Sequence, residues 1–136
     1  MSIAIYPPPP KVPSVLFKAK EAYGLWLPVH RDFPRVERLA IGQRIEQLFL
    51  DLLELILTAS YLTLEKKNIA LSQTIGKLDN IKFFLQLAWE NKLIKTERYA
   101  NLSQELEGVG RMLGGWRKGL EQKLRQVPFG NLTEKK

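Results

Sequence analysis

The side chains in this sequence that could take part in catalysis are few and poorly placed for it. His30 is the only histidine, and the absence of cysteine excludes thiolate nucleophiles, disulfides and cysteine-ligated zinc. Asp32 lies two residues from His30, and residues two apart on a helix do not face each other. We expect His30 near a helix end and Glu46, Asp51 and Glu54 on the solvent edge of a helix. No Glu-x-x-His pair or phosphate-binding loop is present, so the sequence predicts a non-enzyme without metal or cofactor.

Basic residues are the more informative chemical feature. The formal net charge is +7, and most of the surplus lies after residue 64. Arg111, Lys118 and Arg125 are seven residues apart, so on a helix they form one stripe suited to phosphate contacts. The sequence predicts a nucleic-acid-binding surface made of Lys66, Lys67, Lys77, Lys82, Arg111, Arg117, Lys118, Lys123 and Arg125. Ordinary solubility charge is the alternative explanation.

The elements that carry these residues are predicted to be helices. Apolar residues recur at three-four spacing, and no strand-like run is present, which favours an all-α, antiparallel up-down four-helix bundle over residues 14–126. The helices are expected at about 14–31, 35–61, 70–91 and 96–125, with Ser14 and Thr96 as N-caps and Pro28 bending or ending the first. Residues 65–68 are predicted to form a polar loop.

The two ends of the chain are predicted to lie outside the bundle. Residues 1–13 contain four consecutive prolines and should form an extended arm, whereas 127–136 should form a flexible basic tail. No secretory signal is visible, and the most apolar stretch, 48–57, is too short and too charged to span a bilayer. These features predict a cytoplasmic protein.

Two features of the predicted helices point to a further neighbour. Residues 35–61 are apolar over most of the helix circumference, which favours a central helix or one that buries a second face against another chain. Five glycines also interrupt the last helix, at 108, 110, 114, 115 and 119. Each costs about 1 kcal/mol relative to alanine, so a helix of the same chain, a second subunit or a nucleic-acid backbone should approach closely there, unless the helix breaks near residues 114–115. If a second subunit is that neighbour, the contact residues are expected to be Leu53, Leu57, Phe83, Gly110 and Gly114.

The segment 107–116 reads Glu-Gly-Val-Gly-Arg-Met-Leu-Gly-Gly-Trp. It resembles the signature of the accessory variability determinant (Avd) proteins, the accessory proteins of diversity-generating retroelements. Residues 78–88, with aromatic side chains at Phe83 and Phe84, add to the resemblance. The wider group includes four-helix-bundle proteins encoded in intervening sequences of ribosomal RNA genes. In the family pattern, basic residues occupy the positions of Lys82 and Gln86, and Gln86 departs from it.

The resemblance implies a ring-like homo-oligomer, a pentamer, that has a basic surface. It also implies association with a reverse transcriptase and with RNA or DNA during mutagenic retrohoming. The alternative is a structural or protein-interaction bundle of the ribosomal intervening-sequence type with no specific nucleic-acid role. Binding to a membrane surface is disfavoured, because a bundle would bury the apolar faces that such binding needs.

Overall fold

The structure is a computed structural model that describes residues 13–126. Its helices are α1 (Ser14–Arg31), α2 (Arg35–Leu39), α3 (Ile41–Ala59), α4 (Leu64–Glu90) and α5 (Thr96–Gln126). Residues 13–126 contain no strand, so the prediction of an all-α protein with four long helices is confirmed. The predicted tail and residues 1–12 of the predicted arm lie outside the described residues.

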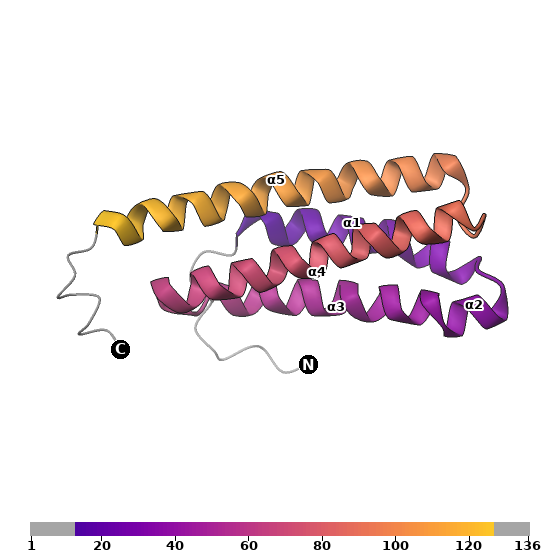
Figure 1. Ribbon diagram of the computed structural model, residues 1–136, viewed down its shortest axis with the longest axis horizontal. Helices are drawn as coiled ribbons and strands as arrows, with labels where there is room; N and C mark the ends of the chain where they lie inside the picture. The colour runs from indigo at the N-terminus through magenta and orange to yellow at the C-terminus, as the bar shows by residue number, and fades with distance from the viewer. Residues whose placement is uncertain (1–12, 127–136) are drawn as a thin grey trace, which may run out of the picture.

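The four long helices lie side by side, and the chain turns back at each connection between them (Figure 1). α3 packs against α1 and α4, and α5 packs against α4 and α1. α5 runs well past the start of α1 (Figure 1). The C-terminal part of α5 therefore lies beyond the N-terminal end of α1 (Figure 1).

The core lies along the axis between these helices. Trp26 of α1 is fully buried and stacks on Phe49 of α3, with ring centroids 5.9 Å apart. On α5 the predicted apolar seam faces inward at Leu102, Leu106 and Leu113, which are all within 1% of complete burial. Burying one such side chain stabilises the fold by about 1.5–3 kcal/mol. The leucines that recur at three-four spacing on α5 therefore supply much of the stability of the core.

The predicted helix 35–61 is wrong as a single element, because the backbone breaks at Ala40 (φ −109°, ψ −98°). In an unbroken helix the Arg38 carbonyl would accept from the N–H of Gly42. Instead, the Arg38 carbonyl oxygen lies 2.9 Å from Nε2 of His30. At Gly42, α3 approaches α1 so closely that an added Cβ would lie 2.6 Å from His30 Cδ2. The break therefore accompanies a close helix crossing that local sequence does not reveal.

Two further sets of local predictions are wrong. Residues 65–68 are helical, because α4 begins at Leu64 and places the buried Ala70 and Leu71 against the core. Ser14 and Thr96 are the first helical residues and not N-caps; Pro13 caps α1. Pro28 lies inside α1, which ends at Arg31, and the alternative of a break near residues 114–115 does not hold, because α5 is continuous there.

The assignment of Glu46 to the solvent edge is also wrong, because its carboxylate lies between α1 and α3. Tyr23 donates a hydrogen bond to Glu46 over 2.5 Å, and Trp26 Nε1 donates another over 3.0 Å. His30 Nδ1 lies 3.7 Å from the same carboxylate. The hydrogen bond from the phenol, together with burial and the negative charge of Glu46, raises the pKa of Tyr23 to about 12. Glu46 thus joins α1 to α3 through hydrogen bonds that a solvent-facing carboxylate would not make.

Candidate nucleic-acid interface

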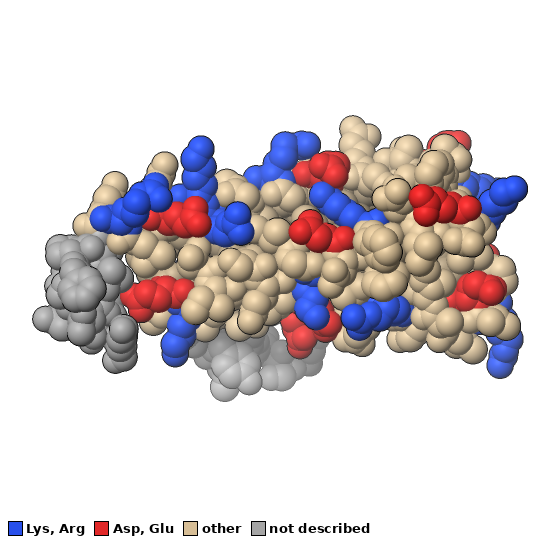
Figure 2. Space-filling view, in the orientation of Figure 1, with Lys and Arg blue, Asp and Glu red and all other residues tan. Residues whose placement is uncertain are grey.

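The charge of α5 changes sign along its length. Residues 96–110 carry Glu97, Glu105 and Glu107 with one arginine, whereas residues 111–126 carry five basic residues and one acidic residue, Glu121. Figure 2 shows Lys and Arg side chains gathered at the upper left, over the C-terminal part of α5. The five basic residues that the sequence predicted on the last helix therefore lie toward the end of the bundle where α5 extends past α1 (Figure 1).

Arg111, Lys118 and Arg125 form the stripe that their spacing predicts, and all three are exposed. The stripe spans about 21 Å along the continuous helix, a length that matches about six phosphates of one nucleic-acid strand. Lys123 is also exposed, and Arg117 is half-buried. No ion pair engages these five side chains among the residues that the structure describes.

Lys18 of α1 lies at the inner end of this stripe. Its ammonium group pairs with Glu105 over 3.1 Å. A Cβ added to Gly108 would lie 2.7 Å from Lys18 Cε and 3.8 Å from Nη2 of Arg111. Gly108 therefore lets the Lys18 side chain cross α5 beside Arg111, and this glycine has a neighbour within its own chain.

The four predicted lysines of α4 divide into two pairs. Lys82 lies 3.0 Å from Glu107 of α5, and Lys77 lies 3.6 Å from Asp51 of α3, so each has a carboxylate partner on a neighbouring helix. Lys66 is exposed and Lys67 half-buried in the first turns of α4, which begins at the same end of the bundle as the C-terminal part of α5 (Figure 1). The fold thus brings Lys66 and Lys67 to the basic end of the molecule, whereas Lys77 and Lys82 hold helices together.

The two glycines predicted at a subunit contact have different surroundings. A Cβ on Gly110 would lie 3.4 Å from Leu78 Cδ2, so this glycine already has a close neighbour in α4. Around Gly114, by contrast, a Cβ would meet nothing within 4 Å, and the same holds for Gly115 and Gly119. Packing against the described helices therefore does not explain three of the five glycines.

The three apolar residues predicted at the subunit contact are accessible to different degrees. Phe83 of α4 is 60% exposed, Leu57 of α3 is 42% exposed, and Leu53 is half-buried. Exposed aromatic and aliphatic side chains of this size are available to a neighbouring protein surface.

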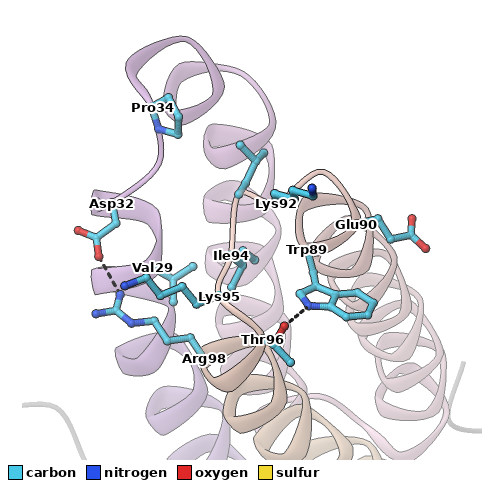
Figure 3. A pocket seen from close by; sticks show the side chains of 11 residues that line it. Val29, Asp32, Pro34, Trp89, Glu90, Lys92, Ile94, Lys95, Thr96 and Arg98 are labelled. Carbon is cyan, nitrogen blue, oxygen red and sulfur yellow. Dashed lines mark hydrogen bonds and ion pairs between the residues drawn. The ribbon is translucent and has the colours of Figure 1, made fainter.

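A concave site, which the sequence did not predict, lies at the end of the bundle opposite the basic end (Figure 3). It encloses about 750 Å³ between the end of α1 and the connection from α4 to α5. Trp89 Nε1 donates a hydrogen bond to Thr96 over 3.0 Å, and Arg98 pairs with Asp32 over 2.9 Å. Its charges are mixed, and its residues come from two segments far apart in the sequence, 29–34 and 89–98, so no local pattern could have predicted it.

Other classes of site are absent from the part of the chain that the structure describes. No group of three His, Asp or Glu side chains within residues 13–126 could hold a metal ion. None of the described helices combines the length and the apolarity that crossing a membrane requires. The basic end of α5 and α4 is the most distinctive charged feature of the described surface.

The fold and this surface define the class as an all-helical bundle protein with a basic end. Comparison with known protein families identifies the family within that class. A family model described as bAvd-like matches residues 18–120, which is more than half of the chain. The protein therefore belongs to the bAvd-like family, as the motif at 107–116 indicated. A search of curated proteins found no match.

Proposed function

We propose that this chain is a non-catalytic, cytoplasmic accessory protein of a diversity-generating retroelement. In this role it binds a reverse transcriptase and RNA or DNA and supports mutagenic retrohoming. Membership of the bAvd-like family supports the class of function. The observation that carries nucleic-acid binding is the exposed stripe of Arg111, Lys118 and Arg125.

The basic end suits a sequence-independent contact with a phosphate backbone. Lysine and arginine bound to phosphates release counterions, so affinity depends mainly on charge and falls steeply with salt. Arg111, Lys118 and Arg125 project from one continuous helix, which fixes their spacing without a loop rearrangement. Lys66 and Lys67 of α4 widen the same end.

The proposal includes a ring-like homo-oligomer, with five copies, of up-down four-helix bundles. Exposed Phe83 and Leu57 supply apolar contact area for such an assembly. A ring would repeat the basic end once per subunit, and linked binding sites raise the overall affinity well above that of a single site.

The test measures RNA binding of the full chain as a function of salt. The first variant changes Arg111, Lys118 and Arg125 to glutamine. The control changes Arg31, Arg35 and Arg44 to glutamine, which removes the same charge from exposed residues of α1, α2 and α3.

We expect the α5 variant to lose affinity, and its slope of log affinity against log salt should fall by about 2, because each single-strand phosphate contact contributes about 0.7. The control should keep most of its affinity. Size exclusion with light scattering reports the mass of the assembly in the same samples. Equal loss in both variants would refute a specific basic site.

The competing function is a structural or protein-interaction bundle of the ribosomal intervening-sequence type. The observation that favours it is the pairing of Lys77 and Lys82 with carboxylates, which gives these lysines a structural role. If the full chain ignores RNA at low salt, this second function is the better explanation, and the α5 stripe is solubility charge.

A further inference from the structure

The concave site at the end of the bundle opposite the basic end combines an apolar interior with a charged rim (Figure 3). Its two most buried lining residues are Val29 of α1, 3% exposed, and Ile94 of the α4–α5 connection, 5% exposed. The charged rim consists of the exposed residues Asp32, Glu90, Lys92, Lys95 and Arg98. The volume of about 750 Å³ is usual for a ligand-binding pocket, so the site can take several side chains of a partner.

The acidic side chains of this rim already have partners within the chain, whereas two of the basic side chains do not. Asp32 pairs with Arg98 over 2.9 Å, and Glu90 accepts a side-chain hydrogen bond within α4 over 3.2 Å. Among the residues that the structure describes, no ion pair engages Lys92 or Lys95. The site therefore presents two unpaired positive charges, and a ligand that matches them must carry negative charge.

The backbone at Lys92 gives a second, independent indication of binding. Lys92 has a φ of 62°, and no other non-glycine residue in the described part of the chain has a positive φ. It follows the C-cap of α4, and the Leu93 N–H closes the turn with a hydrogen bond of 2.9 Å to the Ala88 carbonyl oxygen. Glycine usually occupies this position, because a residue with a Cβ is sterically disfavoured there. A lysine held in this conformation at the rim of a pocket indicates that its side chain is used in binding.

We propose that this pocket binds a short acidic segment of a partner protein, in which carboxylates flank an aliphatic side chain. The aliphatic side chain packs against Val29 and Ile94, and the carboxylates pair with Lys92 and Lys95. Two observations favour such a segment over a nucleic acid. The two acidic side chains of the rim repel a continuous row of phosphates, and a phosphate backbone has no apolar group for the interior. None of the pocket residues belongs to the basic stripe of α5 or to the proposed subunit contacts, so this site is separate from both.

The first test selects peptides from a library of random short sequences displayed on phage, with the full chain as the target. The pocket variant carries Lys92→Gln with Lys95→Gln. The matched control carries Lys20→Gln with Arg44→Gln, which removes the same charge from exposed residues outside the pocket. We expect the unchanged chain and the control to enrich peptides in which Asp or Glu flanks Leu, Ile or Val. The pocket variant should lose that enrichment.

Fluorescence anisotropy of a labelled Glu-Leu-Glu-Leu-Glu peptide then measures affinity. The pocket variant should bind this peptide about ten times more weakly than the control, because each exposed ion pair changes affinity by a factor of about three. Serine in place of both leucines of the peptide should also weaken binding at least about tenfold, because the apolar contact is lost.

Lys92→Gly separates binding from folding. Glycine adopts a positive φ without steric cost, so this variant should raise Tm. It should nevertheless bind the peptide about three times more weakly, because one ion pair is lost.

Three results would overturn the proposal. If acidic peptides are not enriched, or remain enriched with the pocket variant, the pocket does not select them. A Lys92→Gly chain with raised Tm and unchanged affinity would show that the lysine has no part in binding. If the pocket variant loses as much affinity for labelled RNA as the α5 variant does, the pocket belongs to the nucleic-acid interface. Peptide binding is measured without RNA, so this proposal can fail without affecting the proposed function.

Discussion

Changing Gly114, Gly115 and Gly119 to alanine should stabilise the isolated chain. Each glycine lies inside α5, and a Cβ at any of the three positions would meet nothing within 4 Å. Glycine in a helix interior costs about 0.5–1 kcal/mol relative to alanine, because it loses more backbone freedom on folding. The three changes together should therefore raise the free energy of unfolding by about 2 kcal/mol.

The assay is thermal unfolding followed by circular dichroism at 222 nm, at a protein concentration where light scattering shows single chains. About 2 kcal/mol should raise Tm by about 8 °C for a domain of this size. Urea unfolding gives the same free energy independently, provided that its slope against urea concentration does not change.

Gly42→Ala is the matched control, because its Cβ would lie 2.6 Å from His30 Cδ2 and 3.2 Å from the Glu37 carbonyl oxygen. It should lower the free energy of unfolding by about 1–3 kcal/mol through overpacking. A triple variant with an unchanged or lower Tm would refute the reasoning, since open space around three helical glycines leaves no source for a loss. If alanine stabilises single chains but weakens the oligomer, a neighbouring subunit approaches α5 at these glycines.

Two further predictions concern assembly and pH. Phe83→Glu should reduce the mass of the oligomer measured by light scattering. Helicity should not fall, because the Phe83 side chain is 60% exposed and does not belong to the core. The control is Val36→Glu, at a position on α2 that is 72% exposed, and it should leave the mass unchanged. The free energy of unfolding should fall between about pH 10 and pH 12, because the pKa of Tyr23 is raised from 10.0 to about 12 in the folded chain. The folded state binds the phenolic proton more tightly, so this contribution is complete below pH 10 and is lost as pH rises to about 12. Tyr23→Phe should remove that pH dependence and cost about 1–2 kcal/mol at neutral pH, measured by urea unfolding, because Glu46 loses one hydrogen bond.

The local pattern of the sequence was sufficient for the helices that have one apolar stripe. In α5, residues such as Leu102, Leu106 and Leu113 recur at three-four spacing and are buried where that spacing predicts. The stripe of Arg111, Lys118 and Arg125 follows from the same periodicity, because the position of a residue around a helix depends only on its number along it. The family motif at 107–116 was equally readable, since it is contiguous in the chain.

What the sequence determined by itself was therefore the helical class, the apolar seam, the basic stripe and the family. Tertiary structure decided everything that depends on a second helix. Only packing showed that Glu46 bonds to Tyr23 and Trp26, that Lys82 pairs with Glu107, and that α3 separates from α2 at Ala40. The physical reason is that these positions are set by the partner's distance and orientation, which the periodicity of one helix does not encode.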